Sequence, residues 1–250
     1  HRRDRVPLCM ASILEKLVPD SSRVMGEIRH IHVNGAGNRF CAYLGAWTVF
    51  EDHFSRLGHG SWQERVKSLE SFSGSSAGTV VALAMCVGLS CEETRAIVDP
   101  IVQDPRIATA DPDVKRLADS FGIFSGNNLR AVVHKVLDAA GLSRETTFAR
   151  LARLLGKRYA VKVTNLSTSL TEIMDDVGTP DVRIDDAAVA SMSIPVLFEP
   201  VRIGDDLYAD GDLCASVAGP QPASETCVWF IREVGRKDIR TWSEFAAAMT

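Results

Sequence analysis

A serine and an aspartate, far apart in the sequence, are the residue types that acyl transfer requires. Gly74-Ser75-Ser76-Ala77-Gly78 fits the pattern G-x-S-x-G and lies between a predicted strand and a predicted helix. In that context the serine sits on a sharp turn, and the helix N-terminus points toward the charge that develops on an attacked carbonyl. Ser76 is therefore the candidate nucleophile, with Gly74 and Gly78 as the small residues of the turn. A plain small-residue turn before a helix explains these five residues equally well.

No histidine stands where the usual chain order of a catalytic triad would place the base for Ser76. His134 is the only histidine after Ser76, and it lies within an amphipathic helical pattern. In α/β-hydrolases the histidine follows the acid, late in the chain. Asp210, in Tyr208-Ala209-Asp210-Gly211, is the candidate, because a carboxylate within hydrogen-bond reach of the hydroxyl can act as the base. An ordinary Asp-Gly turn is the alternative interpretation.

Small residues also follow the first predicted strand, in Gly35-Ala36-Gly37-Asn38-Arg39. Successive small residues let several backbone N–H groups converge on one point, and Arg39 can add a positive charge beside them. A dinucleotide-binding loop is the competing interpretation, but Phe40 stands where its third glycine belongs. The segment therefore fits an oxyanion hole better than a nucleotide site.

These segments, in this order, resemble the motifs of the patatin-like phospholipase family. Gly35 to Arg39 is similar to the family's G-G-G-x-R/K oxyanion loop, and Gly74 to Gly78 is similar to its nucleophile turn. Asp210-Gly211 is similar to its D-G-G/A motif. Ala190 to Pro200 is similar to the A-S-x-x-x-P-x-x-F-x-P segment that precedes the aspartate strand. The resemblance extends over most of the chain, from about Ile31 to Ile231.

The resemblance implies an α/β fold, a three-layer α/β/α sandwich with a mainly parallel central sheet. It also implies a dyad of Ser76 and Asp210 that hydrolyses acyl esters of phospholipids or other lipids, with no metal or other cofactor. The oxyanion hole would consist of Gly35, Ala36, Gly37 and Arg39, with the backbone N–H groups of Ala36 and Gly37 holding the oxyanion and Arg39 nearby. Contact with a membrane would be peripheral and transient. The alternatives are a soluble carboxylesterase on the same dyad and a non-catalytic module that binds lipid or protein.

Three positions depart from the family pattern. Ala36 replaces the middle glycine of the oxyanion loop, and Phe40 replaces its last glycine. Asp212 stands where the aspartate motif has a second glycine or alanine. If Asp212 lies beside Asp210, like-charge repulsion raises the pKa of Asp210. The alternative is that Asp212 points into solvent, where water and salt screen its charge.

Composition and charge argue against several other classes of protein. The chain has 250 residues, with 28 Lys and Arg against 32 Asp and Glu. A dedicated nucleic-acid-binding protein normally has a basic domain, so we expect no nucleic-acid partner. Because hydrophobic residues make up 46% and charged residues 24%, we expect one globular domain over residues 1–250, with the motifs in about 28–231. The longest apolar stretch, 80–89, is about half the length of a membrane-spanning helix, and we expect a cytoplasmic protein.

Cysteine and histidine spacing does not indicate a metal site. The six cysteines form no C-x-x-C pair. His30 and His32 alternate on a predicted strand and so point to one face, but no third ligand accompanies them. The cationic side chains of Arg150, Arg153, Lys157 and Arg158 are interpreted as a solvated helix face.

Hydrophobic periodicity and turn residues predict alternating strands and helices. Strands are expected over 28–33, 66–72, 159–166, 207–209 and 226–231. Helices are expected over 10–17, 40–54, 79–89, 90–98, 114–120, 128–139, 148–155 and 185–192. Ser90 and Glu93 form a capping box at the start of one helix, and Asp99-Pro100 is expected to end it. Two successive strand-turn-helix units favour a parallel sheet covered by helices.

Overall fold

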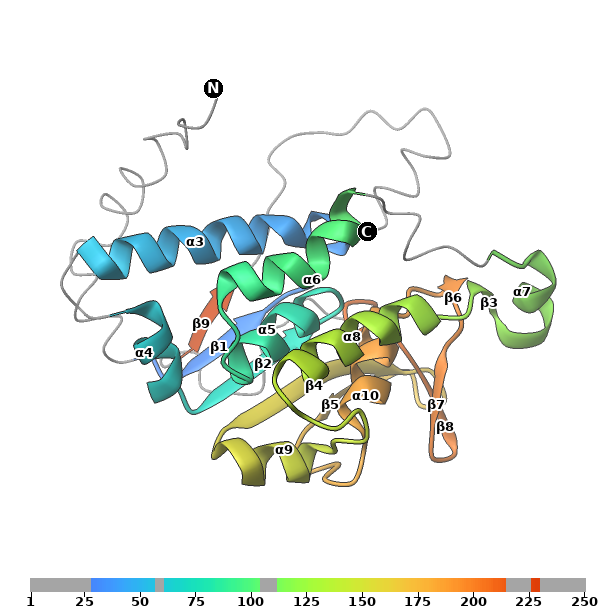
Figure 1. Ribbon diagram of the computed structural model, residues 1–250. Coiled ribbons are helices and arrows are strands. Elements are labelled where there is room, and N and C mark those ends of the chain that lie inside the picture. Colours follow the sequence, from blue (N-terminus) through green and yellow to red (C-terminus); the bar gives the residue numbers. More distant parts are fainter. Residues whose placement is uncertain (1–27, 57–60, 104–111, 215–225, 230–250) are drawn as a thin grey trace.

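The computed structural model of the chain describes residues 28–56, 61–103, 112–214 and 226–229 (Figure 1). The helix predicted over 10–17 lies outside these residues. The strands are β1 His30–Val33, β2 Ser71–Ser75, β3 Gly122–Phe124, β4 Arg158–Asn165, β5 Leu170–Met174, β6 Val196–Phe198, β7 Val201–Ile203, β8 Asp206–Ala209 and β9 Thr226–Trp229. The helices are α3 Cys41–Arg56, α4 Trp62–Ser68, α5 Gly78–Cys86, α6 Cys91–Gln103, α7 Val114–Ser120, α8 Asn127–Ala139, α9 Phe148–Leu155 and α10 Ile184–Met192, with a 3-10 turn η1 over Gly37–Phe40.

The main sheet is parallel at its centre and antiparallel at one side. Its strand order is β7-β8-β4-β2-β1-β9, and β5 also pairs with β4. Strands β9, β1, β2 and β4 run parallel, whereas β5, β7 and β8 are antiparallel to their neighbours. The mixed α/β architecture with a mainly parallel central sheet confirms the predicted fold class and is consistent with an α/β/α sandwich.

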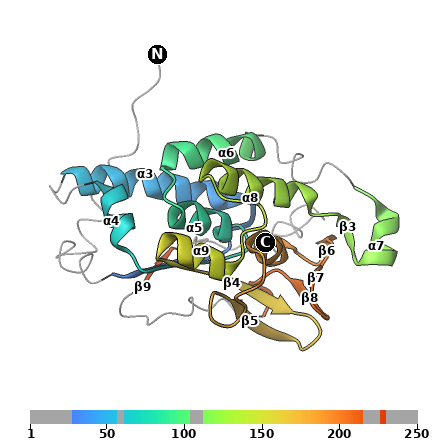
Figure 2. The ribbon, with the colours of Figure 1, turned by 60° about the horizontal axis from the view of Figure 1, so that its bottom comes forward.

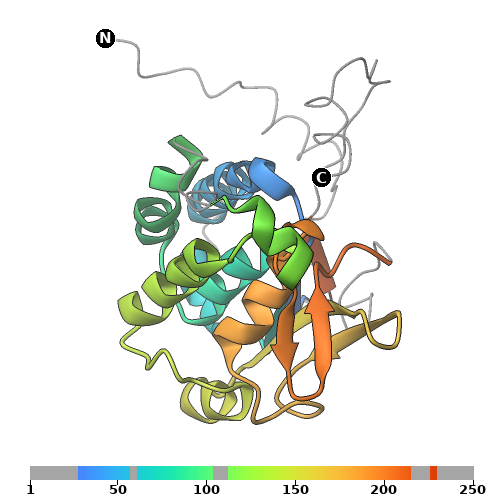
Figure 3. The same ribbon diagram turned by 90° about the vertical axis from the view of Figure 1, so that its right-hand side faces the viewer.

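The described helices gather on one side of the sheet, as Figure 3 shows, so the described residues contain one helical layer of the expected three-layer sandwich. Strands β1, β2 and β4 are neighbours in chain order, and right-handed crossovers between such strands place the connecting helices on the same face. Helices α5 and α10 contact the sheet directly, and α8 packs against both of them. Helix α6 packs against α3 and α8 and lies farther from the sheet than α5 (Figure 2). Because β1 and β2 run parallel, their carboxyl ends lie at the same edge of the sheet.

Helix α5 is the central element of the hydrophobic core. Every residue from Gly78 to Cys86 is buried, which explains why the sequence of this helix is apolar on all sides. Phe72 on β2 and Tyr159 on β4 are paired in register and are both almost completely buried. Every residue of β2 and all but the first residue of β4 are buried, so both faces of these strands are covered, and this burial fixes the turns that follow them.

The predicted start of one strand and the predicted end of one helix were wrong by the largest margin. The strand predicted over 66–72 begins only at Ser71, because residues 62–68 form helix α4. Ser61 and Glu64 make a reciprocal capping box at its start, with Glu64 N donating to Ser61 Oγ over 3.1 Å. Helix α6 was expected to end at Asp99-Pro100 but continues to Gln103 with Pro100 inside it. Proline removes one helical hydrogen bond, and here the helix continues past it.

The cationic run is not one solvated face. Arg150 and Arg153 are exposed, as predicted. The Lys157 ammonium, however, donates to Val66 O over 2.8 Å and lies 5.4 Å from the centroid of the Phe72 ring. Arg158 forms ion pairs with Asp175 and Asp176. The side chains of Lys157 and Arg158 therefore stabilise the packing around β4.

Candidate active site

Ser76 lies at the sharp turn between β2 and α5. Its backbone has φ 47°, in the left-handed region that non-glycine residues seldom adopt. Such a strained turn is the geometry that presents a nucleophile at the end of a strand. The Ser76 carbonyl accepts a hydrogen bond from Thr79 N over 3.0 Å, and its N–H donates to Ser191 Oγ over 2.9 Å. Both hydrogen bonds hold the turn in this conformation.

The glycines of the turn are required by close backbone contacts. A Cβ atom at Gly74 would lie 2.6 Å from Thr79 Cα. A Cβ atom at Gly78 would overlap the carbonyl oxygens of Val33 and Asn34 at the end of β1. The role predicted for Gly74 and Gly78 is therefore geometric: they let α5 start directly beside the loop that follows β1.

Asp210 follows β8, and the end of α10 holds its backbone. Asp210 N donates to Ser193 O over 2.9 Å, and Gly211 N donates to Ser191 O over 3.2 Å. One carboxylate oxygen, Oδ1, accepts from Asp212 N over 2.9 Å. The other oxygen, Oδ2, has no partner with full hydrogen-bond geometry among the described residues. Oδ2 is thus the oxygen available to a serine hydroxyl.

The structure brings the predicted residues together at one cavity. This cavity, of about 90 Å³, is lined by Gly35, Ala36, Gly37, Ser76, Ile194, Asp210, Asp212 and Leu213. These residues come from the loop after β1, the turn after β2, the segment after α10 and the turn after β8. Arg39 is not among the residues that line the cavity; it lies on η1 and its side chain is half-buried.

Burial raises the pKa of the Asp210 carboxyl from its usual value to about 6. The Ser76 side chain and the N–H of Asp212 lower this pKa through hydrogen bonding, and Lys162 also lowers it through its charge. The negative charge of Asp212 acts in the opposite direction and raises it. A base whose pKa lies near the working pH is both ionised and a strong proton acceptor. The electrostatics of Asp210 therefore suit general base catalysis.

In the predicted oxyanion loop, the hydrogen bonds of the described residues occupy one of the three N–H groups of Gly35, Ala36 and Gly37. Gly35 N donates to Ser75 Oγ and to Asp212 Oδ2, both over 3.0 Å. Among the described residues, the N–H groups of Ala36 and Gly37 have no acceptor. Gly35 was predicted as part of the oxyanion hole, and its N–H anchors the loop. Ala36 and Gly37 remain as the candidate donors.

Ser191 and Lys162 are site residues that the sequence interpretation missed. Ser191 Oγ accepts from Ser76 N and donates to Lys162 O over 2.6 Å, so it connects the nucleophile turn to β4. The Lys162 side chain forms an ion pair with Asp212 Oδ1 at 2.8 Å. The signal for Lys162 was a lysine between Val161 and Val163 in a buried strand. The interpretation that Asp212 points into solvent is wrong, because this ion pair and Gly35 hold its side chain.

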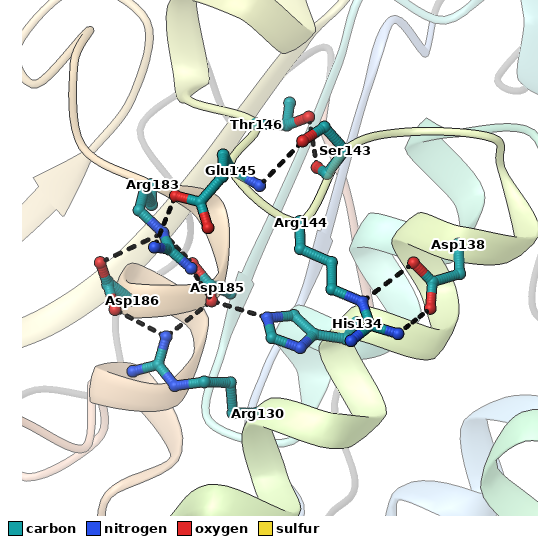
Figure 4. Close-up of polar contacts among 10 residues, drawn as sticks. All are labelled: Arg130, His134, Asp138, Ser143, Arg144, Glu145, Thr146, Arg183, Asp185 and Asp186. Atoms are coloured by element: carbon teal, nitrogen blue, oxygen red, sulfur yellow. Dashed lines mark hydrogen bonds and ion pairs between the residues drawn. The ribbon is translucent and has the colours of Figure 1, made fainter.

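His134 lies away from the cavity, in an ionic network between α8 and α10 (Figure 4). Its Nε2 atom is 2.8 Å from Asp185 Oδ2. Asp185 and Ser191 lie in the first and last turns of α10, about 9 Å apart along the helix axis. The pair of His134 and Asp185 therefore belongs to the opposite end of the helix from Ser76, and it cannot complete a triad there.

His30 and His32 point to one face of β1, as predicted. Their Nδ1 atoms each lie 2.8 Å from a serine hydroxyl on the neighbouring strand, Ser71 and Ser73 respectively. His32 Nε2 is also 2.9 Å from Asn34 Oδ1, and burial lowers the pKa of His32. Within the described ranges, no group of three or more His, Cys, Asp or Glu side chains is placed to hold a metal ion. No helix in this part of the chain is long and apolar enough to cross a bilayer.

Sequence comparisons relate this chain to known proteins. A sequence model described as patatin-like phospholipase matches residues 33–218. "Uncharacterized protein R571" of Acanthamoeba polyphaga mimivirus is 24% identical over 74% of this chain, and "Probable lipid hydrolase 463L" of Invertebrate iridescent virus 6 is 23% identical over 59%. The matched regions cover 58% and 51% of those relatives, so the chain spans little more than half their length.

Solved structures share the fold at low sequence identity. VipD from Legionella pneumophila matches with a TM-score of 0.51 and 19% identity, over 81% of this chain and 49% of that one. A chain of the ExoU–SpcU complex of the Pseudomonas aeruginosa type III secretion system matches with a TM-score of 0.50 and 16% identity, over 81% and 43%. Because the family model matches residues 33–218, which is most of the chain, the chain belongs to the patatin-like phospholipase family.

Proposed function

We propose that the protein is a lipid acyl hydrolase of the phospholipase A type, which cleaves acyl esters through a covalent intermediate on Ser76 with Asp210 as the base. One observation carries this proposal. Ser76, Asp210, Ala36 and Gly37 line one cavity although they come from three separate segments of the chain, and the N–H groups of Ala36 and Gly37 have no acceptor among the described residues. A nucleophile, a base and oxyanion donors are the groups that ester hydrolysis requires.

The reaction follows from the placement of these groups. Asp210 Oδ2 accepts the Ser76 hydroxyl proton while Oγ attacks the ester carbonyl, and the N–H groups of Ala36 and Gly37 stabilise the oxyanion. The tetrahedral intermediate collapses, and the alcohol leaves with the proton from Asp210. Asp210 then takes a proton from water, which attacks the acyl-enzyme and releases the fatty acid and free Ser76. Because the base must be ionised, kcat/KM should fall below about pH 6.

A lipid substrate is supported by an apolar groove near the cavity. The groove, of about 410 Å³, is lined by Leu117, Phe121, Leu166, Pro195, Val196, Pro200 and Leu207. Its segment 195–200 begins directly after Ile194, which lines the catalytic cavity. The side chains of Phe121 and Val196 are 61% and 55% exposed. Exposed apolar surface of this kind suits transient contact with hydrocarbon.

An active-site serine probe tests the dyad. A fluorophosphonate should label the wild-type protein but not Ser76→Ala, whereas the exposed Ser143→Ala control should be labelled like the wild type. Hydrolysis should be lost in Ser76→Ala and in Asp210→Asn, with Asp205→Asn as the exposed control on the same hairpin. A folded wild-type protein without labelling would favour the non-catalytic module.

The choice between a lipase and a soluble carboxylesterase depends on the physical state of the substrate. The same acyl ester is assayed as a monomer and in phosphatidylcholine vesicles. A lipid hydrolase should be faster on the vesicles. Equal rates, or activity on short-chain monomers alone, would favour the soluble carboxylesterase.

A further inference from the structure

Asp212 contacts three parts of the active site at once. Its backbone N–H donates to Asp210 Oδ1 over 2.9 Å. Its Oδ2 atom accepts from Gly35 N over 3.0 Å, and its Oδ1 atom is 2.8 Å from Lys162 Nζ. One residue thus connects the base, the oxyanion loop and the central strand β4.

Lys162 is almost completely buried. Its side chain is 3% exposed, and it projects from a strand that is buried over most of its length. Moving an ammonium group out of water costs several kcal/mol unless an opposite charge and hydrogen bonds compensate for it. Asp212 supplies the opposite charge. The ion pair therefore fixes the position of the Asp212 carboxylate, whose own side chain is 28% exposed.

Gly35 lies tightly between Asp212 and the nucleophile. A Cβ atom there would overlap Asp212 Oδ2 and would lie 2.8 Å from Ser76 Cβ. The Gly35 N–H is shared by Asp212 and Ser75 and cannot also point to an oxyanion. The start of the oxyanion loop is thus attached to the turn that bears the base, directly beside the reacting hydroxyl.

We propose that Asp212 and Lys162 are positioning residues that clamp the oxyanion loop to the base turn. In this clamp Gly35 N–H is the anchor, and Ala36 and Gly37 are left as the donors to the oxyanion. Lys162 also neutralises Asp212, so that a second carboxylate can stand beside Asp210 without holding the base in its protonated form. This inference rests on the proposed function, because it assigns roles within the same reaction.

Four titratable groups determine the charge at this point: Asp210, Asp212, Lys162 and the neighbouring His32. Asp212 raises the pKa of Asp210 and Lys162 lowers it. His32 is buried, and burial lowers its pKa, which favours its neutral form. Removing Asp212 and removing Lys162 should therefore shift the pKa of Asp210 in opposite directions.

The test uses Asp212→Gly, Lys162→Met and the double variant, with the exposed Asp205→Gly as the control on the same hairpin. Asp212→Gly restores the residue type of the family motif but loses the anchor, so kcat should fall roughly 10- to 100-fold with little change in KM. The acidic limb of its kcat/KM profile should move to lower pH, by about one unit. Lys162→Met should move that limb to higher pH.

The double variant separates a clamp from two independent defects. If the two residues act as a unit, adding Lys162→Met to Asp212→Gly should cause no further loss of kcat. Losses that multiply, or limbs that move in the same direction, would overturn the assignment. A merely structural role would lower the amount of folded protein without moving either limb.

Amide hydrogen exchange tests the clamp without any activity. The Gly35 amide should be protected in the wild type and in Asp205→Gly, and it should exchange at least about tenfold faster in Asp212→Gly. Unchanged exchange in Asp212→Gly would overturn the clamp even in an active enzyme. If the wild type hydrolyses no ester but Gly35 shows the expected difference, the proposed function fails and the clamp stands.

Discussion

Two buried aspartates lie at opposite ends of helix α10, and their carboxyl groups have opposite properties. Asp185, in the first turn, is fully buried, and Asp210, bonded to the residue that ends the helix, is 5% exposed. Burial alone would raise the pKa of Asp185, but hydrogen bonds from Arg183, His134 and Arg130 outweigh burial and lower it to about 2. Burial raises the pKa of Asp210 to about 6.

The difference lies in the donors around each carboxylate. Asp185 Oδ2 lies 2.7 Å from Arg130 Nη1, 2.7 Å from Arg183 Nη2 and 2.8 Å from His134 Nε2 (Figure 4). Asp210 has a backbone N–H on one oxygen and leaves the other to the hydroxyl it would deprotonate. A carboxylate that is saturated with cations cannot take a proton, so only the sparsely bonded aspartate can act as a base.

The largest expected effect is on activity and separates the two aspartates. Asp210→Asn should lower kcat by roughly three or more orders of magnitude, because it removes one member of a catalytic unit. Asp185→Asn should leave kcat of the folded protein within about threefold, since its carboxylate lies at the other end of α10. Ester hydrolysis is measured at a temperature where circular dichroism shows both variants folded. Comparable losses in both would contradict the assignment of roles.

The second expected effect is on the free energy of unfolding, to which Asp185 contributes more than Asp210. Asp185→Ala leaves the cationic side chains of Arg130 and Arg183 without a buried partner, and it should cost about 3–5 kcal/mol in the free energy of unfolding. Asp138→Ala is the matched control, because Asp138 pairs with Arg144 on the surface, where both side chains are about half exposed. Surface pairs contribute much less to stability than buried pairs, so Asp138→Ala should lower the free energy of unfolding far less than Asp185→Ala. Urea denaturation at pH 7 measures both.

The pH dependence of stability gives a further check on Asp185. Its pKa is lowered in the folded state, so its ionised form favours folding at neutral pH. That contribution is complete above the usual pKa and is lost as the pH falls toward about 2. In Asp185→Ala this part of the acid sensitivity should be absent. An unchanged acid transition would show that the network does not hold Asp185 ionised.

The site near the end of α10 that holds Ser76 and Asp210 was easier to predict from the sequence than the ionic network around Asp185. Ser76 and Asp210 could be found because a strained turn and a strand-end turn require glycines at fixed offsets. The network around Asp185 joins residues from α8 and from the loop before α10, and nothing in their spacing indicates that they meet. The clamp of Asp212 and Lys162 likewise depends on tertiary contact, and only the lysine in an apolar strand hinted at it.

The fold shows the same division between local and non-local signals. Helices α7 and α9 have the predicted bounds because local caps define them: Asp113 accepts from Lys115 N, and Thr147 accepts from Arg150 N. Strands β3 and β6, with Gly122 paired to Val196, were missed because three-residue strands have almost no periodicity. The start of α4 was missed although its capping box was present in the sequence.

The third expected effect is the loss of folding stability that the buried Asp210 carboxylate causes. Because the pKa of Asp210 is raised from 3.8 to about 6 in the folded protein, its ionisation favours the unfolded state. The sign is the reverse of that for Asp185: the fold loses stability as the pH rises through about 6. Asp210→Asn should therefore be more stable than the wild type by about 3 kcal/mol at pH 8. At pH 4 the gain should be much smaller, and a gain independent of pH would contradict the raised pKa.

The smallest effect is expected for His134, and it decides between the dyad and a conventional triad. His134→Ala removes one of three donors to Asp185, so the free energy of unfolding should fall by about 1–2 kcal/mol. The fall should be less than that for Asp185→Ala, because Arg130 and Arg183 still hold the carboxylate. The rate on a monomeric ester should stay within about twofold, since Asp185, which His134 contacts, lies about 9 Å along α10 from Ser191, the serine that bonds the nucleophile turn. A loss of three or more decades in kcat in folded protein would mean that this histidine reaches Ser76 during turnover, and the contrast between the two ends of α10 would then fail.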